Sequence, residues 1–162
     1  MRKYKNKLFA ILLSIFAVVS FTSCDDYEWR EGTMIRYKTI DASYNGTIID
    51  DIPINYNFVE VDGHYDRLDD IRFHSGHIDI DTRDYIHEFN LTLSNSDAYL
   101  PVKVRDNIGG RLEGRQVDDF LNAVVEVVRR NGHATIYVNG VAGNWASFKL
   151  NFFIDIDAYV SY

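Results

Sequence analysis

The sequence predicts a mainly β protein, an immunoglobulin-like antiparallel β-sandwich with one helix near residues 116–130. Turn-forming pairs such as Asn45-Gly46 and Asp62-Gly63 recur along the chain. Between them apolar and polar residues alternate, as they do in strands that bury one face. One segment departs from this pattern and carries the spacing of a helix. A lipocalin-like β-barrel is the alternative architecture, but its helix would be expected after the last strand.

The clearest strand spans residues 147–159, in which apolar side chains occupy alternate positions. Its expected neighbour is residues 134–141, across a loop centred on Gly143. Register should follow hydrophobicity, so Ile136 is expected opposite Leu150. The two segments are therefore expected to form a hairpin.

Further strands are expected at residues 35–41, 54–61, 86–93 and 100–104. Because proline cannot donate a hydrogen bond to a β-ladder, it is confined to strand starts, bulges and edge strands. The strands near Pro53 and Pro101 are therefore expected to begin late or to lie at an edge.

A second hairpin is predicted over residues 70–81, with Ser75-Gly76 as a two-residue turn. This register pairs Phe73 with Ile78 on the inner face. The outer face could gather a divalent cation, because imidazole and carboxylate groups suit zinc and carboxylates suit calcium. The candidate metal ligands are His74, His77, Asp79 and Asp81. The alternative is an ordinary charged strand face in contact with water.

Residues 116–130 carry apolar side chains at helical spacing, with acidic residues in the first turn and arginines in the last. These charges complement the helix dipole, and Asn131-Gly132 supplies a stop. Four β-branched valines would also suit a buried strand, so that alternative stays open.

The first 24 residues have the pattern of an export signal. Basic residues precede a 14-residue stretch, Leu8 to Phe21, that is apolar apart from two serines, and Thr22-Ser23-Cys24 closes it. The stretch is shorter than the roughly 20 apolar residues of a membrane-spanning helix. Cys24 is the only cysteine in the chain, so no internal disulfide can form.

This segment resembles a bacterial lipoprotein signal, and the acidic residues Asp25, Asp26 and Glu28 resemble the export signal of Bacteroidetes-type surface lipoproteins. The resemblance implies cleavage before Cys24 and attachment of diacylglycerol and palmitate to that residue. It also implies a protein anchored in the outer membrane and facing the exterior, with the lipid bilayer as a partner. The alternative is an ordinary secretory signal followed by an unmodified thiol.

We expect three regions: a signal peptide at residues 1–23, an acidic tether at 24–33 and a single β-sandwich domain at 34–162. Removing the signal takes four cations and no anions from a chain of formal charge −7, which leaves −11. A field of that sign repels nucleic acid, which is therefore not expected as a partner.

The sequence contains no Gly-x-Ser-x-Gly or His-Glu-x-x-His motif, no P-loop, no dinucleotide-binding fingerprint and no EF-hand loop. We therefore expect a non-enzymatic lipoprotein with a binding or accessory role and no cofactor, unless calcium or zinc binds at residues 70–81. Trp29 and Trp145 could stack on a sugar or contact a protein partner. In the alternative, Trp145 folds back onto the end of the sandwich. The expected partner besides the bilayer is an unknown protein or glycan.

Overall fold

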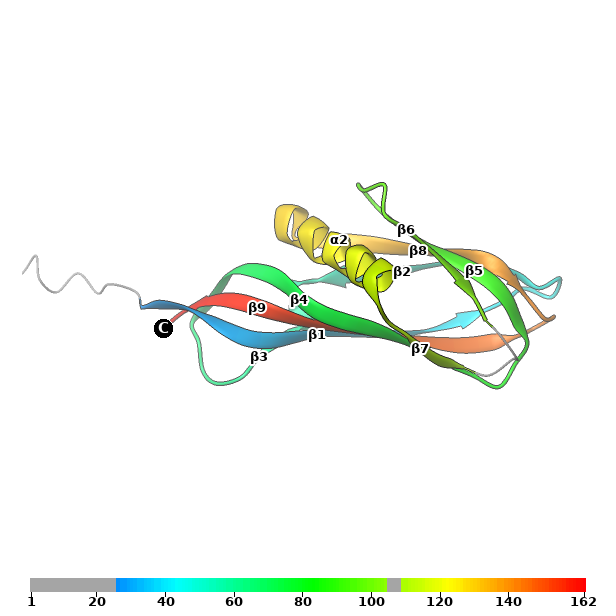
Figure 1. Cartoon of the computed structure of the whole chain (residues 1–162), viewed down its shortest axis with the longest axis horizontal. Coiled ribbons are helices and arrows are strands. Elements are labelled where there is room, and N and C mark those ends of the chain that lie inside the picture. Colours follow the sequence, from blue (N-terminus) through cyan, green and yellow to red (C-terminus); the bar gives the residue numbers. More distant parts are fainter. Residues whose placement is uncertain (1–25, 105–108) are drawn as a thin grey trace, which may run out of the picture.

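The computed structural model describes residues 26–104 and 109–162, and in them two antiparallel sheets pack face to face beside one α-helix (Figure 1). The described elements are β1 (Tyr27–Asp41), β2 (Thr47–Asn55), the 3-10 turn η1 (Tyr56–Phe58), β3 (Val59–Val61), β4 (Arg67–Thr82), β5 (Ile86–Leu93), β6 (Tyr99–Lys103), β7 (Gly110–Leu112), α2 (Arg115–Asn131), β8 (His133–Ala142) and β9 (Ser147–Ser161). One sheet has the order β3-β1-β9-β4-β7, and the other has the order β2-β8-β5-β6. The predicted class, a mainly β sandwich with one helix, is confirmed.

Neither sheet closes on itself in the part of the chain that the structure describes, so the lipocalin-like barrel is not formed. The first strand lies beside the last, and β2 lies beside β8. This order is that of a double-sheet jelly roll. It differs in detail from immunoglobulin-like sandwiches, which pair the first strand with the second.

The core lies between the two sheets and is built from alternating side chains. Along β9 the even-numbered residues from Phe148 to Val160 are buried. Ile136 and Val138 of β8, which belongs to the facing sheet, are also buried. Removal of this apolar surface from water is the main force that holds the sheets together. The alternation read from the sequence for both segments is therefore confirmed.

The predicted hairpin between these two segments is wrong. β8 pairs with β2 and β5, whereas β9 pairs with β1 and β4 in the other sheet. Ile136 lies opposite Ile52 and Leu93, not opposite Leu150. Alternation identifies the face that a strand turns to the core, but not the sheet to which the strand belongs.

The predicted hairpin at residues 70–81 is also wrong, because β4 runs through Ser75-Gly76 as one strand. β4 pairs with β9, and a β-bulge between Phe73 and Ser75 inserts one extra residue. The bulge shifts the alternation by one position, so Ile71 and Ile78 share the buried face without a turn between them. A bulge and a hairpin turn therefore produce the same pattern of apolar residues here.

Helix α2 confirms the predicted helix and closes one side of the sandwich, where it packs against β4, β6 and β8. Gly132 ends the helix with φ 79°, and its N–H donates to the Val128 carbonyl. Gly76 of β4 lies beneath the helix. A Cβ on Gly76 would lie 2.6 Å from Leu121 Cδ1 and 2.8 Å from the Phe153 carbonyl oxygen. This glycine therefore permits close helix packing instead of making a turn.

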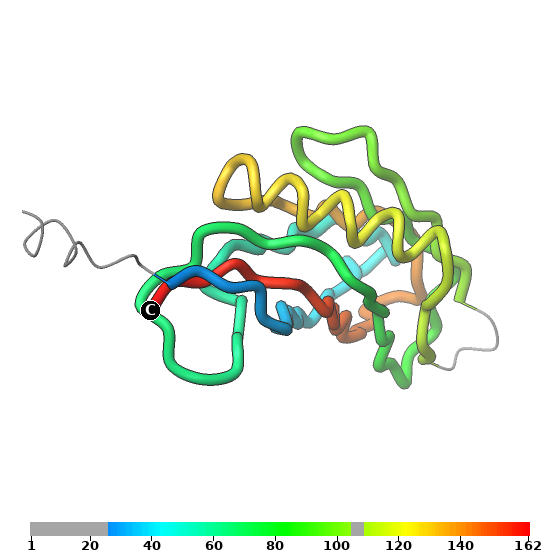
Figure 2. Tube along the Cα trace, turned by 60° about the vertical axis from the view of Figure 1, so that its left-hand side comes forward, coloured from blue at the N-terminus to red at the C-terminus, as the bar shows by residue number. Residues whose placement is uncertain are grey.

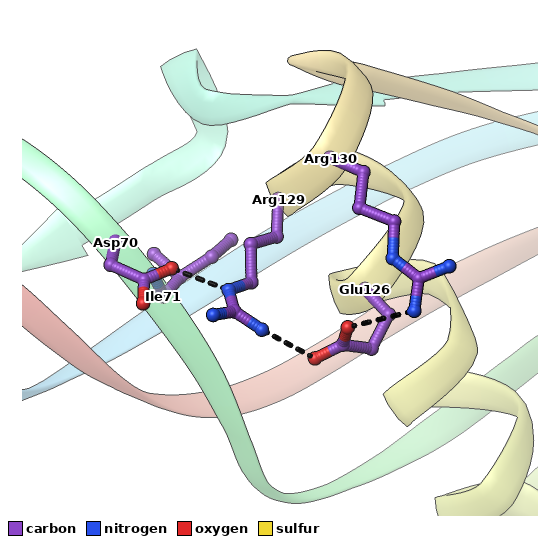
Figure 3. A network of polar contacts seen from close by, with 5 residues as sticks. All are labelled: Asp70, Ile71, Glu126, Arg129 and Arg130. Atoms are coloured by element: carbon purple, nitrogen blue, oxygen red, sulfur yellow. Dashed lines mark hydrogen bonds and ion pairs between the residues drawn. The ribbon is translucent and has the colours of Figure 1, made fainter.

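Charged side chains fix the last turns of α2 to β4 (Figure 3). Arg129 Nε donates to Asp70 Oδ1 at 2.6 Å, and Glu126 accepts from Arg129 and Arg130 at 3.4 Å each. Asp70 Oδ1 also accepts from the backbone N–H of Ile71 at 2.9 Å. The hydrogen bond to Asp70 raises the pKa of Arg129. These contacts hold the helix on the same strand that its apolar stripe covers.

Strand β1 begins at Tyr27, so the acidic tether predicted for residues 24–33 is wrong from Tyr27 onward. The whole of β1 pairs with β9. The pattern of apolar and polar residues did not indicate the first part of this strand, because Tyr27, Glu28 and Trp29 are all exposed. With no buried face to create alternation, a paired strand at the end of a sheet resembles an irregular segment.

The remaining strand predictions differ mainly in their bounds. Residues 54–61 divide into the end of β2, η1 and β3, whereas residues 86–93 form β5 as predicted. Pro53 lies in β2 and Pro101 lies in β6, and both are edge strands of their sheet. Of the two outcomes predicted for these strands, a late start or an edge position, the edge position is observed.

Candidate functional site

The four candidate metal ligands do not converge on one point. His74 lies at the bulge of β4, and His77 stacks on Phe153 of β9 with ring centroids 4.8 Å apart. Asp79 accepts hydrogen bonds from Arg111 Nε at 2.9 Å and Arg111 Nη2 at 3.2 Å. These bonds lower the pKa of Asp79. The carboxylate is thus held by a guanidinium, and of the two imidazoles only that of His77 lies near it, with Nε2 3.8 Å from Asp79 Oδ2.

The last candidate ligand, Asp81, lies opposite Lys149 of β9. In residues 26–104 and 109–162, no group of three or more His, Cys, Asp or Glu side chains is arranged to hold a metal ion. The hairpin that would have brought the four ligands together is absent. Asp79 lies beside Arg111 instead, and Asp81 lies opposite Lys149.

A hollow of about 390 Å3 lies on the outer face of the five-stranded sheet. Its lining includes Glu31, Asp155 and Asp157. Ser75 Oγ donates to Asp155 Oδ2 at 2.7 Å, and His74 Nδ1 lies 3.9 Å from Asp157 Oδ2. The hollow therefore offers several hydrogen-bond acceptors.

Aromatic rings gather on the same sheet face where β1 begins and β9 ends. The ring of Tyr159 lies 5.3 Å from that of Tyr27 and 5.0 Å from that of Trp29. Arg72 Cζ lies 4.1 Å from the centre of the Trp29 ring, a cation–π contact. Tyr162 lies at the same end. We call Tyr27, Trp29, Tyr159 and Tyr162 the N-terminal aromatic cluster.

Glu28 ties the C-terminal residue into this cluster. Its carboxylate accepts hydrogen bonds from the Tyr162 hydroxyl and from Arg30 Nε. Both bonds lower the pKa of Glu28, and the bond from Tyr162 has the larger effect. Arg30 Cζ also lies 4.6 Å from the centre of the Tyr162 ring. The negative charge of Glu28 is therefore opposed by the guanidinium of Arg30 beside the cluster.

Three loops meet at the opposite end of the sandwich, and backbone hydrogen bonds join them. Gly143 N donates to Tyr85 O at 2.6 Å, and Ala142 N donates to Gly46 O at 2.8 Å. Trp145 N lies 3.4 Å from Ser43 O, to which it donates. These bonds link the loops after β1, β4 and β8 into one surface.

This surface presents three exposed aromatic side chains, Tyr44, Tyr85 and Trp145, which we call the loop aromatic cluster. Trp145 is 74% exposed and Tyr44 is 68% exposed, with ring centroids 6.2 Å apart and planes inclined by 50°. The alternative in which Trp145 folds back onto the sandwich is therefore not observed. Trp145 has φ 60°, in the left-handed region that favours glycine. Strained backbone of this kind is concentrated at functional sites.

The start of β1 and the turn between β8 and β9 lie at opposite ends of an elongated molecule (Figures 1 and 2). Trp29 is close to the start of β1, and Trp145 lies beside the loop that follows Asp41, the last residue of β1. The strand between Trp29 and Asp41 spans about 40 Å at 3.3 Å per residue. The sequence-predicted stacking residues thus belong to two separate surfaces.

Cys24 and Asp25 lie outside the described residues, and Asp26 is exposed just before β1. No helix in the described ranges is both long and apolar enough to span a bilayer.

Sequence reasoning selected both tryptophans but missed the tyrosines around them. Tyr44 directly precedes the turn pair Asn45-Gly46, a signal that could have placed it at a loop tip. Tyr159 becomes a neighbour of Trp29 only through the pairing of β1 with β9. That contact joins residues far apart in the chain, so no local pattern indicates it.

No family model and no curated protein matches this sequence. Among solved structures, the chain is similar to the decameric BFDV capsid protein, with a TM-score of 0.43, 6% identity, and coverage of 82% of this chain and 99% of that chain. It is also similar to desmodium yellow mottle tymovirus, with a TM-score of 0.36, 10% identity, and coverage of 80% and 88%. For the tobacco streak virus coat protein the TM-score is 0.32 at 13% identity, with coverage of 76% and 85%. Each of these three TM-scores is below 0.5.

Proposed function

We propose that this protein is a non-enzymatic lipoprotein, anchored on the exterior of the outer membrane through Cys24, that binds carbohydrate through its loop aromatic cluster. The observation that carries the proposal is Trp145, a large apolar side chain held 74% exposed on a left-handed backbone. Exposing Trp145 forgoes the free energy of burying its ring, and its φ adds about 1–2 kcal/mol of strain. A binding role accounts for both costs.

The position of the anchor supports the choice of the loop end as the binding surface. The signal-like segment ends at Cys24, which precedes the first residue of β1 by three positions. The loops that carry Tyr44 and Trp145 lie at the other end of β1. A domain held at Cys24 therefore presents these rings away from the lipid.

Carbohydrate fits the chemistry of this surface. The C–H face of a sugar ring stacks on an aromatic ring, and the sugar hydroxyls form hydrogen bonds to amide groups. Tyr44 and Trp145 supply two rings that are inclined to one another. Asn45 and Asn144 supply exposed amide-bearing residues in the same two loops.

The carboxylates at this end support a binding role more than a hydrolytic one. Asp84 Oδ2 accepts from Ser147 N at 2.7 Å, and Asp41 Oδ1 accepts from Ser147 Oγ at 2.7 Å. Both groups hold the start of β9 in place. A glycosidase needs a pair of carboxyl groups free to flank a glycosidic bond.

The test is binding of the purified mature protein to a panel of immobilised polysaccharides, followed by calorimetry with the best ligand. Trp145→Ala removes a stacking ring worth about 1–1.5 kcal/mol, which corresponds to about a 10-fold loss of affinity. Tyr44→Ala should weaken binding by a smaller factor. Trp29→Ala is the matched control, because it removes the same kind of ring from the other end and should leave affinity unchanged.

Three results would count against the proposal. Binding of no polysaccharide would remove carbohydrate as the ligand class. Equal losses from Trp145→Ala and Trp29→Ala would show that the loop end is not the binding surface. Release of new reducing ends from the bound polysaccharide would show that the protein is an enzyme.

A further inference from the structure

We infer that the N-terminal aromatic cluster lies against the headgroups of the membrane that holds Cys24, so that the domain stands on this end. The inference rests on the lipid anchor of the proposed function and adds a second membrane contact to it. The partner is a lipid surface, and the contact is made by side chains of the folded domain.

The length of chain between the anchor and the fold requires this proximity. Tyr27 is three residues after Cys24, and three residues span at most about 11 Å even when fully extended. Tyr27 is already paired with Ser161 of β9. A thioether-linked lipid at Cys24 therefore brings the first residues of β1 to the membrane surface, with no tether to separate them.

The side chains at this end suit a membrane interface. Tyr27, Trp29 and Tyr162 remain 42%, 40% and 38% exposed. Tyrosine and tryptophan favour the headgroup region, because each ring offers an apolar body and a polar group that reaches water. Contact with lipid would cover apolar ring surface that the fold itself leaves open.

Backbone hydrogen bonds join the end that carries the N-terminal aromatic cluster to the rest of the sandwich. A membrane contact at this end can therefore orient the whole domain. Tyr162 N donates to Asp26 O at 3.3 Å, and Asp66 N donates to Ser161 O at 2.8 Å. The ring of Tyr159 in β9 stacks on that of Tyr27 in β1, the neighbouring strand of the same sheet. A contact made by these rings is therefore transmitted to the long strands β1 and β9.

Net charge does not supply the attraction. Arg72 and Arg67 are exposed at this end, but Asp26 and Asp66 are exposed there as well. Glu28 is held by Arg30 and by the Tyr162 hydroxyl. The rings therefore carry the contact, and it should change little between low and high salt.

The chain provides its own probes, because Trp29 and Trp145 are its only tryptophans and lie at opposite ends. Full-length lipoprotein recovered from membranes is reconstituted into phosphatidylcholine vesicles in which part of the lipid carries bromine near the headgroup. Trp145→Phe leaves Trp29 as the only tryptophan, and Trp29→Phe leaves Trp145. We expect brominated lipid to quench at least half of the Trp29 fluorescence and almost none of the Trp145 fluorescence, in both low and high salt.

Two outcomes would overturn the inference. If neither tryptophan is quenched, the domain stands clear of the headgroups. If both are quenched to the same extent, the domain lies flat on the membrane instead of standing on its end.

A second arm separates this inference from the anchor itself. The mature chain from Cys24 onward is produced without lipid, and its only thiol is coupled to a maleimide-bearing lipid in the same vesicles. If the natural protein carries no lipid, it fails to enter vesicles and the proposed anchor is wrong. The coupled protein still reports on the contact, because quenching of Trp29 alone supports it and absence of quenching rejects it.

Discussion

The two ends of the sandwich carry the same kinds of side chain in different settings. At the N-terminal end, Tyr27 and Trp29 lie along β1, and the rings of both contact that of Tyr159 on the paired strand β9. At the loop end, Tyr44 and Trp145 stand on turns, and each is more than two thirds exposed. Rings along a flat ladder suit an extended surface such as a bilayer, whereas rings on turns can enclose part of a small ligand. The comparison teaches that the setting of an aromatic side chain indicates its role better than its presence in the sequence.

The largest expected effect comes from Cys24→Ser, which removes the proposed site of lipid attachment. Neither end of the domain would then be anchored. Loss of the proposed acyl chains would remove about 0.8 kcal/mol for every buried methylene group, so the protein should leave the membrane fraction almost completely. Fractionation of cells followed by immunoblotting measures this. Trp145→Ala is the control that should stay with the membranes. Retention of the Cys24→Ser protein at the wild-type level would contradict the anchor.

Gly76→Ala should destabilise the packing of α2 against β4, in the part of the domain that lies between the two ends. The added Cβ would meet the Phe153 carbonyl oxygen at 2.8 Å and Leu121 at 2.6 Å, so the helix or the strand must shift. We expect a loss of about 1–3 kcal/mol in the free energy of unfolding, measured in urea. Gly110→Ala is the control, since nothing lies within 4 Å of a Cβ there. Equal stability of the two variants would show that helix packing does not depend on this glycine.

The alternation of apolar residues was sufficient to predict the sandwich, the helix and the faces turned to the core. It could not predict the partners of each strand. A bulge in β4 reproduces the pattern of a hairpin, and Ile136 and Leu150 both face the core from different sheets. Strand pairing depends on contacts between distant segments, whereas the turn and periodicity signals are local.

The candidate sites were predictable to a different degree. Trp145 could be placed at a turn from its neighbours Gly143 and Asn144, and the structure shows it exposed. The metal-ligand hypothesis depended on a hairpin that would bring the four side chains together. Because these residues form one continuous strand, the side chains do not converge. The N-terminal aromatic cluster is assembled from both ends of the chain, and only the pairing of β1 with β9 brings it together.

Trp145→Gly should sharpen the comparison by separating binding from stability. Glycine adopts φ 60° without strain, whereas alanine does not, so the glycine variant should be more stable than Trp145→Ala by about 1 kcal/mol. Both variants should lose the proposed affinity for carbohydrate to the same extent. Thermal unfolding and calorimetry measure the two quantities. A glycine variant less stable than the alanine variant would show that Trp145 is not strained.

The smallest expected effect tests the fastening of the N-terminal end. Tyr162→Phe removes the first cause of the lowered pKa of Glu28 and leaves the second, Arg30. The pKa of Glu28 should therefore rise toward its ordinary value. Because the folded pKa of this carboxyl lies below its unfolded value, its contribution to stability is present above the unfolded value and is lost as the pH falls through the folded pKa. In the variant this contribution should be smaller, and its loss should be complete at a higher pH.

An NMR titration of the Glu28 side-chain carboxyl carbon measures this shift. Tyr27→Phe is the control, because its hydroxyl makes no hydrogen bond to Glu28 among the described contacts. An unchanged titration in Tyr162→Phe would show that the C-terminal tyrosine does not engage this carboxylate.

The central claim is that the molecule stands on the cell surface with its N-terminal end at the lipid and Trp145 pointing outward. Asn144→Cys tests it most directly, because a lipid-modified Cys24 leaves the new thiol as the only free one in the chain. A membrane-impermeant maleimide applied to intact cells should label Asn144→Cys rapidly and Tyr27→Cys much more slowly. Labelling of Asn144→Cys only after the cells are broken, or equal labelling of both variants on intact cells, would contradict the claim.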